Sequence, residues 1–292
     1  PVTKYFTLIQ CFVKFIKFRR GNKIIIKKKI NMKIGIIGLG VLGKAYKKGF
    51  TTWGHKVTSY DIKGNYIFEK VLKTEICFVC VPSPSRKNGD CDTRIVVSVL
   101  RKLNKKKFNG IVCVASTVNI GFTSKSISKF KNLKICSVPE LLKERSSSKD
   151  FLNNKIIVVG TKDKKKFLKI KRCFRNKIFY MVKPDEAEIF KYFNNCYAAL
   201  RVVFANIFYE ISKKKNCNYK KIKDIYIKTG KAVDMYLDVN KNLRGYAGMC
   251  LPKDVRALKH HMKKMRISFN LINQIDLDNN KLKKTVFKGM RK

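Results

Sequence analysis

The chain has 292 residues, of which 45% are apolar and 11% aromatic, so it holds enough apolar surface for a packed core and is not a disordered protein. Lys and Arg number 67 against 19 Asp and Glu, which gives a formal net charge of +48. Such a charge is typical of proteins that bind nucleic acids, but the lysines are spread over the whole chain, which argues against a dedicated nucleic-acid surface.

Residues 1–31 differ in composition from the rest, since they contain nine Lys or Arg and no acidic residue. A basic targeting peptide or a helix on a membrane surface is one interpretation. We favour an extension outside the fold, because Met32-Lys33-Ile34-Gly35 is typical of the start of an enzyme. No apolar stretch approaches the ~18–20 residues that span a bilayer, so no membrane partner is expected.

From Met32 the pattern alternates between strands and helices. A strand at Lys33–Ile37 precedes a helix at Val41–Phe50 and a strand at Lys56–Tyr60. Further short apolar runs predict strands at Ile76–Val81, Gly110–Ala115, Lys134–Val138 and Lys155–Val159. Alternation of this kind indicates parallel βαβ units. We therefore expect an α/β fold in which residues 32–184 form a Rossmann-type, doubly wound parallel sheet.

After Pro184 the sequence becomes mainly helical. Glu186–Lys214 contains no Gly or Pro and is rich in Ala, Phe, Tyr and Leu, which predicts one long helix. Shorter helices are predicted at Tyr219–Thr229 and Pro252–Lys264. The run Tyr197–Phe208 is too apolar to face water on all sides. Residues 185–292 are therefore expected to form a helical central domain whose long helix makes a homodimer interface.

Ten cysteines do not indicate a disulfide framework here, because the chain is neither short nor dense in Cys. A reduced, cytoplasmic protein is the expectation. Cys77 and Cys80 form a Cys-x-x-Cys pair, but in a strand their side chains point to opposite faces. With only three His in the chain, no metal site is expected.

A glycine fingerprint lies between the first strand and the first helix. Its residues are Gly38, Leu39, Gly40, Val41, Leu42 and Gly43, and Asp61 ends the next strand. The three glycines allow a tight turn, a close approach of pyrophosphate and close packing of the helix, whose free N–H groups bind the anion. Asp61 would accept hydrogen bonds from a ribose and repel a 2′-phosphate. The pattern predicts NAD rather than NADP.

Three further motifs end predicted strands. They are Val81-Pro82-Ser83-Pro84, Ser116-Thr117-Val118 and Val138-Pro139-Glu140-Leu141-Leu142-Lys143-Glu144. In an open α/β sheet the carboxyl ends of the strands face one ligand crevice. We expect these turns to line a single site.

The second half adds two groups of polar residues. On a helix, Lys191 and Asn195 are i,i+4 neighbours, so a cation and an amide donor share one face. Cys250 stands just ahead of Pro252 at a predicted helix start, where the helix N-terminus and Lys253 would favour a reactive thiolate. Asp254 lies one turn later and could orient a water or a hydroxyl.

Taken in order, the motifs from the glycine fingerprint to Gly245–Asp254 resemble the UDP-glucose/GDP-mannose 6-dehydrogenase family. The resemblance runs from Met32 to about Lys292, and the Cys-x-Pro-Lys-Asp block is specific to that family. It implies an NAD-dependent double oxidation that converts the 6-hydroxymethyl group of a nucleotide sugar, UDP-glucose first among them, into a carboxylate.

The resemblance also implies roles for single residues. Cys250 would capture the aldehyde as a thiohemiacetal, Lys191 and Asn195 would stabilise its oxyanion, and Asp254 with Thr117 would position a water. Glu140 would serve acid/base chemistry. Further cofactor contacts are implied for Ser83, Thr117, Glu144 and Lys253, and substrate contacts for Glu140, Leu141, Glu144, Lys191, Asn195, Gly248, Val239, Asn240, Lys241, Asn242 and Leu243.

The sequence departs from the family pattern at a few points. Ala247 replaces a usual glycine, Ile207 stands where an acid is usual, and the family's C-terminal lobe over the nucleotide is not in this sequence. Other readings stay open: a GDP-mannose or UDP-N-acetylhexosamine enzyme, a single-step β-hydroxyacid dehydrogenase, and a non-catalytic remnant that binds NAD or nucleic acid. A single hydride transfer needs no thiol, so Cys250 argues against the single-step enzyme.

Overall fold

The computed structural model describes residues 31–142, 146–239, 242 and 244–282, and the backbone of strands β1 (Phe15–Arg20) and β2 (Lys23–Lys28). Strands β1 and β2 pair antiparallel, an arrangement that the sequence analysis did not predict. Residues 1–14 lie outside the described part of the chain.

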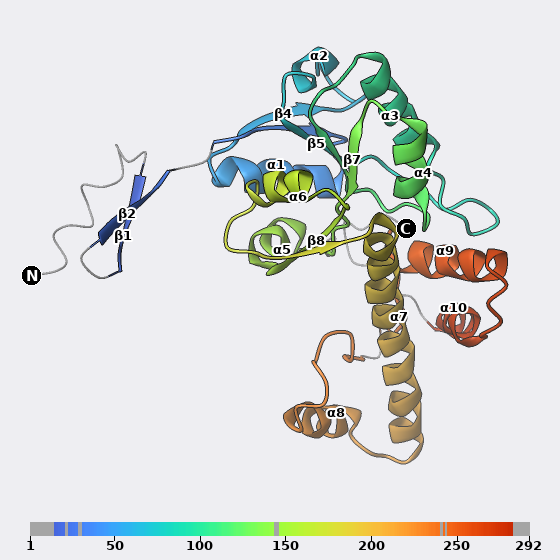
Figure 1. The fold of residues 1–292 in the computed structure, drawn as a ribbon. Helices are drawn as coiled ribbons and strands as arrows, with labels where there is room; N and C mark the ends of the chain where they lie inside the picture. Colours follow the sequence, from blue (N-terminus) through green and yellow to red (C-terminus); the bar gives the residue numbers. More distant parts are fainter. Residues whose placement is uncertain are drawn as a thin grey trace, which may run out of the picture.

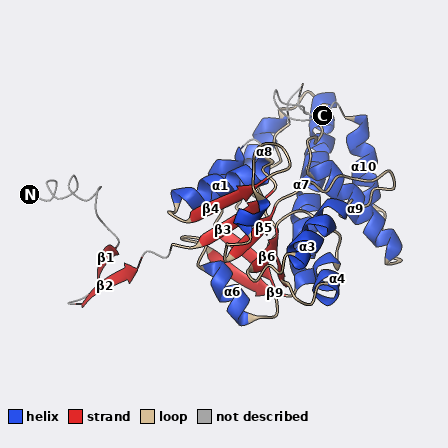
Figure 2. Ribbon diagram, turned by 90° about the horizontal axis from the view of Figure 1, so that it is seen from above, coloured by secondary structure: helices blue, strands red, loops and turns tan. Residues whose placement is uncertain are grey.

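A seven-stranded sheet organises the first half of the chain (Figures 1 and 2). Its strands are β3 (Lys33–Ile37), β4 (Lys56–Tyr60), β5 (Ile76–Val79), β6 (Ile111–Val114), β7 (Lys134–Ser137), β8 (Ile156–Gly160) and β9 (Ile178–Val182). The spatial order is β4-β3-β5-β6-β7-β8-β9. Strands β5 and β6 are buried along their whole length, which explains why they read as uninterrupted apolar runs.

The predicted parallel sheet is confirmed for most of its strands, and one pair differs. Strands β4 to β7 pair in parallel, but β8 pairs with β7 antiparallel through Ser137 and Gly160, and β9 is parallel to β8. The connection between β7 and β8 contains the helix α5 (Ser147–Asn153).

Helices cover both faces of the sheet. They are α1 (Val41–Thr52), α2 (Phe68–Val71), α3 (Arg94–Lys105), α4 (Phe122–Lys129), α5 and α6 (Lys164–Lys171). Phe50 of α1, Phe151 of α5 and Ile170 of α6 belong to one apolar cluster, which also includes Cys80. Leu100 of α3 belongs to the other cluster with Cys77. The doubly wound arrangement and the opposite faces of the two cysteines are confirmed.

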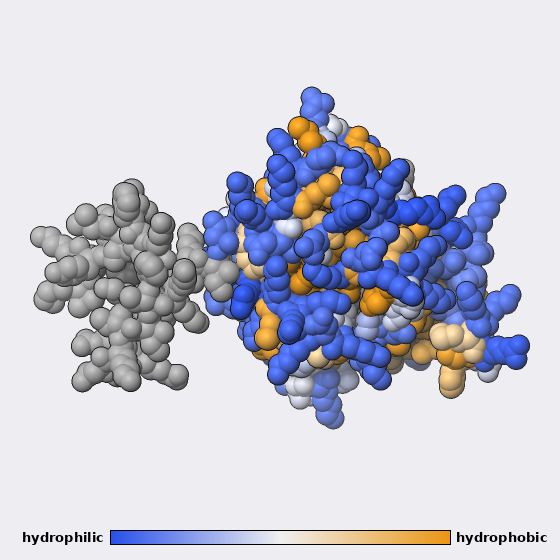
Figure 3. Space-filling view, turned by 45° about the horizontal axis from the view of Figure 1, so that its top comes forward, coloured by the Kyte–Doolittle hydropathy of each residue, from blue (hydrophilic) through white to orange (hydrophobic). Residues whose placement is uncertain are grey.

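The second half is helical, as expected. It contains α7 (Pro184–Lys214), α8 (Tyr219–Lys228), α9 (Leu251–Lys264) and α10 (Leu271–Lys281). In Figure 1, α7 runs away from the sheet, with α9 beside its first turns, α10 next to α9, and α8 to one side of its far end. Among the described residues, no helix is both long enough and apolar enough to cross a bilayer. Hydrophilic side chains cover most of the face in Figure 3, with apolar patches between them.

Candidate functional site

The glycine fingerprint forms a tight turn between β3 and α1. Gly38 has φ +92°, and a Cβ there would lie 2.7 Å from the carbonyl oxygen of Cys80. A Cβ on Gly43 would lie 1.8 Å from the carbonyl oxygen of Gly38, so this glycine lets the helix close onto the turn. A Cβ on Gly40 would meet no atom within 4 Å. The second glycine therefore borders open space, where a pyrophosphate could approach the backbone.

Asp61 lies beside this turn, as predicted. Its Oδ2 accepts the Leu39 N–H at 2.5 Å and its Oδ1 accepts the Lys63 N–H at 2.9 Å. Partial burial would raise the pKa of Asp61, but these backbone hydrogen bonds and the Lys63 ammonium hold it below its ordinary value. The carboxylate is thus held charged at the end of β4, where a ribose is expected.

Glu140 follows β7 and is buried, with 6% exposure. Its Oε2 accepts the Tyr46 hydroxyl at 3.0 Å, and its Oε1 accepts the Leu141 N–H at 3.0 Å. Burial raises the pKa of Glu140, while these hydrogen bonds and the Lys191 ammonium oppose the rise. A carboxyl whose pKa is raised by burial suits proton transfer near neutral pH.

Lys191 and Asn195 lie on one buried face of α7, with 8% and 5% exposure. Lys191 Nζ donates to the carbonyl oxygen of Glu140 at 2.5 Å. Asn195 Nδ2 donates to Oδ2 of Asp254 at 2.5 Å, and Asp254 is fully buried. Helix α7 therefore joins the Glu140 turn of the sheet to the start of α9.

Cys250 is the N-cap residue of α9 and is exposed. Its carbonyl oxygen accepts the Asp254 N–H at 2.9 Å, so the two residues are separated by one helical turn, as predicted. Lys253 Nζ lies 2.8 Å from Oδ1 of Asp254. Burial alone would lower the pKa of Lys253, but Asp254 and the thiols of Cys91 and Cys250 raise it. A cation is therefore fixed beside Cys250.

Cys91 links the motifs of the sheet to this cation. Its Sγ lies 3.5 Å from the carbonyl oxygens of both Ser83 and Thr117, and 4.0 Å from Lys253 Nζ. Ser83 and Thr117 are thus in one place with the Cys250 block. Burial raises the pKa of the Cys91 thiol, while Lys253 opposes the rise.

The structure describes part of the predicted substrate set. Leu141 and Val239 are half-buried, Asn242 is exposed, and Gly248 has φ +85°. The remaining predicted residues, Glu144, Asn240, Lys241 and Leu243, lie outside the described residues.

Three residues without a predicted role contact the site: Tyr46 through Glu140, Cys91 through Ser83, and Glu188 through Gly121. Each one contacts a motif far away in the chain, for example Tyr46 to Glu140 across 94 positions. The spacing of residues within a motif does not predict contacts of this kind. Glu188 alone carried a signal, because it lies one turn before Lys191 in the same motif.

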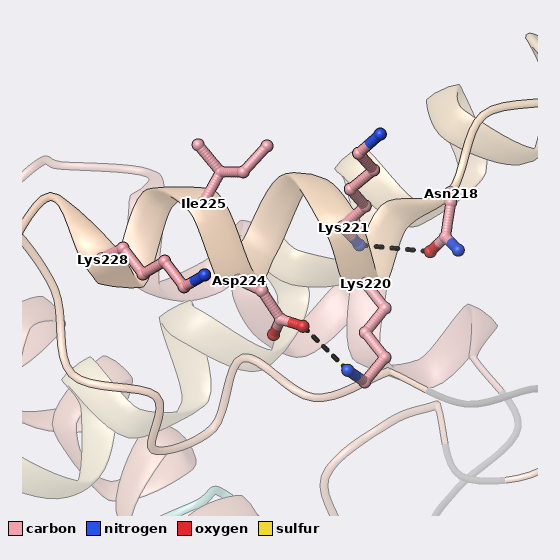
Figure 4. Close-up of a pocket in the computed structure, with 6 residues that line it drawn as sticks. All are labelled: Asn218, Lys220, Lys221, Asp224, Ile225 and Lys228. Atoms are coloured by element: carbon pink, nitrogen blue, oxygen red, sulfur yellow. Dashed lines mark hydrogen bonds and ion pairs between the residues drawn. The ribbon is translucent and has the colours of Figure 1, made fainter.

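Figure 4 shows a surface pocket of about 350 Å³ on α8. Asn218 caps this helix by accepting the Lys221 N–H at 3.2 Å, and Lys220 pairs with Asp224 at 2.8 Å. None of the residues that line the pocket belongs to the motifs above. The pocket is a solvated helix surface and carries no part of the site.

Comparison with known families gives two matches. Residues 64–178 match the profile of the UDP-glucose/GDP-mannose dehydrogenase family, NAD binding domain. Residues 185–281 match the central domain of the same family. The first match begins after the glycine fingerprint, so the geometry of the Gly38 turn is an independent indication of dinucleotide binding.

Relatives in both substrate groups of this family are similar to the chain. A GDP-mannose 6-dehydrogenase from Pseudomonas aeruginosa is 24% identical over 84% of this chain and 67% of its own length. A UDP-glucose 6-dehydrogenase from Campylobacter jejuni is 36% identical over 57% of this chain and 43% of its own length. The chain thus spans two thirds or less of these relatives.

Solved structures share the fold. A UDP-glucose dehydrogenase from Pyrobaculum islandicum superposes with a TM-score of 0.80 at 21% identity, covering 89% of this chain and 70% of the other. A 3-hydroxyisobutyrate dehydrogenase from Mycobacterium tuberculosis gives a TM-score of 0.66 at 14% identity, covering 86% and 94%. The architecture is therefore shared by a UDP-glucose dehydrogenase and a 3-hydroxyisobutyrate dehydrogenase, so the fold alone does not assign the reaction.

Proposed function

The chain belongs to the UDP-glucose/GDP-mannose dehydrogenase family, and from that premise we propose that it is an NAD-dependent nucleotide-sugar 6-dehydrogenase. The proposed reaction oxidises the C6 hydroxymethyl group to a carboxylate in two hydride transfers, the second from a thiohemiacetal on Cys250. One observation carries the proposal. Asn195 of α7 donates to Asp254 of α9 at 2.5 Å, so the two family motifs of the helical half meet one turn from Cys250.

The residues of the glycine turn fit NAD. Gly40 borders open space, and in the described part of the chain no side-chain hydrogen bond caps the start of α1, so its first N–H groups can hold a pyrophosphate. Asp61 would accept hydrogen bonds from the hydroxyls of the adenosine ribose. When bound, NAD supplies the hydride acceptor for both oxidations.

In the first oxidation the sugar loses a hydride from C6 and a proton from the hydroxyl oxygen. Lys191 is buried and, among the described residues, gives one hydrogen bond, to the carbonyl oxygen of Glu140. An ammonium has three N–H donors, so the others can stabilise the developing alkoxide. A water held by Asp254 and Thr117 would accept the proton.

In the second oxidation the Cys250 thiolate attacks C6 of the aldehyde, so a C–S bond forms and the carbonyl electron pair moves to oxygen. Lys191 and Asn195 donate to this oxyanion; removal of such a donor costs roughly 2.7–4 kcal/mol in comparable sites. Loss of the second hydride leaves a thioester. Water held by Asp254 and Thr117 then breaks the C–S bond, which releases the carboxylate and returns the thiolate.

UDP-glucose is the proposed substrate, since the Campylobacter jejuni relative that is 36% identical is a UDP-glucose 6-dehydrogenase. GDP-mannose is the second candidate, because relatives named GDP-mannose 6-dehydrogenase match 84% of the chain at 24% and 25% identity. The test is to supply each nucleotide sugar with NAD and to count NADH per sugar consumed. Two NADH per UDP-glucose are expected. One NADH per sugar, or turnover of small β-hydroxyacids alone, would contradict the proposal.

Quaternary structure and location are also proposals. Phe193, Tyr197, Phe204 and Ile211 of α7 are each at least 50% exposed. At 100° per residue these positions fall on one face of the helix. We propose that a second copy of the chain covers this face in a cytoplasmic homodimer.

A further inference from the structure

The turn after β6 carries Thr117 and leads into α4, and a side chain from α7 holds this segment in place. The Gly121 N–H donates to Glu188 Oε2 at 2.6 Å, and the Thr123 N–H donates to Glu188 Oε1 at 2.8 Å. Gly121 is the N-cap residue of α4, and no side chain of that helix caps it. The first N–H groups of a helix have no partner within the helix. Glu188, which is 2% exposed, supplies the missing acceptors from the other half of the molecule.

Side chains near Glu188 also form hydrogen bonds with residues 118–124. The Tyr192 hydroxyl donates to the carbonyl oxygen of Val118 at 3.0 Å. His261 of α9 accepts the Ile120 N–H on Nε2 at 3.3 Å. One turn before Glu188, Asp185 accepts the Ser124 hydroxyl at 2.5 Å. The residues that follow Thr117 are therefore tied to the same helix that carries Lys191 and Asn195.

We propose that Glu188 is a positioning residue, which fixes Thr117 relative to Lys191 and Asn195. We call the hydrogen bonds from the Gly121 and Thr123 N–H groups to Glu188 the clamp. Glu188 precedes Lys191 by three residues, so the clamp and the Lys191 ammonium share one turn of α7. Loss of the clamp would release the Thr117 turn from α7 without altering the glycine turn. This inference rests on the proposed function for the roles of Thr117, Lys191 and Asn195.

The geometry gives Glu188 no contact with the reacting atoms. Both carboxylate oxygens accept backbone N–H groups. A fixed geometry is worth much in catalysis, since a displacement of about 1 Å can cost about 100-fold in rate. The expected effect of removing Glu188 is therefore on kcat, through the position of Thr117.

The experiment compares Glu188→Ala, Glu188→Gln and the control Glu186→Gln, a neighbouring exposed carboxylate of α7 whose partner is the Lys183 N–H. The full chain is used with NAD bound. Hydrogen exchange of residues 116–124 is measured by mass spectrometry, together with kcat and KM for UDP-glucose. Circular dichroism and thermal melting identify any variant that does not fold.

We expect Glu188→Ala to exchange about tenfold faster in this segment and to lose about 10- to 100-fold in kcat with KM little changed. Glu188→Gln keeps one acceptor oxygen and should lie between wild type and Glu188→Ala, while Glu186→Gln should match wild type. Unchanged exchange in a folded Glu188→Ala would overturn the clamp. A variant that loosens the segment but keeps wild-type kcat would overturn the positioning role. Absence of turnover in the wild type would instead contradict the proposed function, and the exchange rates would still decide the clamp.

Discussion

The two halves of the molecule differ in how they bury apolar surface. In the sheet half, residues 31–182, two large clusters fill both faces of the sheet, with side chains such as Phe50, Phe78 and Leu100 fully buried. In the helical half, residues 184–282, a small cluster around Val203 and Val255 joins α7 to α9 and α10. Beyond it, Phe193 of α7 is 70% exposed.

The two halves therefore differ in how much of their structure rests on their own core. The sheet half has the larger core, in which each fully buried large apolar side chain stabilises the fold by about 1.5–3 kcal/mol. The helical half has less core of its own, and its proposed catalytic residues contact the sheet half, as Lys191 does through Glu140. The candidate site therefore lies at the contact between the sheet half and the helical half.

The largest expected effect is in the rigid half. Gly43→Val would place a side chain 1.8 Å from the Gly38 carbonyl oxygen, and we expect a loss of about 4 kcal/mol or more in the free energy of unfolding. Gly40→Ala is the matched control, because a Cβ there meets nothing within 4 Å. Urea unfolding should leave Gly40→Ala near wild type, while calorimetry should show weaker NAD binding. Equal stability of the two variants would show that the turn is not close-packed.

At the boundary between the halves, Asp254→Ala should cost about 3–5 kcal/mol, because it removes a fully buried carboxylate and leaves the half-buried Lys253 ammonium without its ion-pair partner. Lys220→Ala on α8 removes an exposed ion pair with Asp224 and should cost about 0–1 kcal/mol. Thermal and urea unfolding measure both. Similar losses in the free energy of unfolding for the two variants would contradict the expected difference between the buried pair and the exposed pair.

Glu188 links stability to pH. Burial raises its pKa to about 7 in the folded chain, against the backbone hydrogen bonds that lower it and with the Asp185 carboxylate adding to the rise, whereas an unfolded Glu titrates near about 4.3. Between these values the unfolded state has released the proton that the folded state keeps. The free energy of unfolding should therefore fall as pH rises from about 4.5 to 7, by on the order of 1–3 kcal/mol.

Glu188→Gln should remove that part of the pH dependence. The measurement is urea unfolding of wild type and variant at pH 5 and pH 7.5. Parallel pH dependence in the two proteins would mean that Glu188 does not titrate in this window.

The smallest effect on stability should come from the exposed face of α7. Phe204→Asp should dissociate the proposed dimer while leaving the sheet half folded, since Phe204 is 50% exposed. Ile62→Asp, at an 87% exposed position of the sheet half, is the control and should leave the dimer intact. Sedimentation velocity at micromolar concentration tests both. A monomeric wild type would refute the proposed interface.

The sequence predicted the strands at Lys33–Ile37 and Lys56–Tyr60 because apolar runs and a glycine turn are local signals. It did not predict β9, whose residues Ile178, Tyr180 and Met181 are all exposed by more than 40%. Strand β9 reads IFYMV, a continuous apolar run like those that predicted the other strands, so its sequence carried a local signal that was not used.

The site residues were predicted where a local pattern marks them and missed where only a long-range contact does. Cys250 at a helix start followed from the local Pro252, and the shared face of Lys191 and Asn195 followed from their spacing. The clamp from Glu188 to Gly121 spans 67 positions. No period in the sequence encodes a contact between two folded halves.

The most direct test of the central claim is the fate of the aldehyde at Cys250. Wild type, Cys250→Ser and the control Cys217→Ser, another exposed cysteine, are incubated with UDP-glucose and NAD, and NADH is counted per sugar. We expect two NADH per sugar in wild type and Cys217→Ser, and a block before the second NADH in Cys250→Ser, because serine is a far weaker nucleophile than a thiolate at a helix N-terminus. A Cys250→Ser variant that still yields two NADH per sugar would contradict the account.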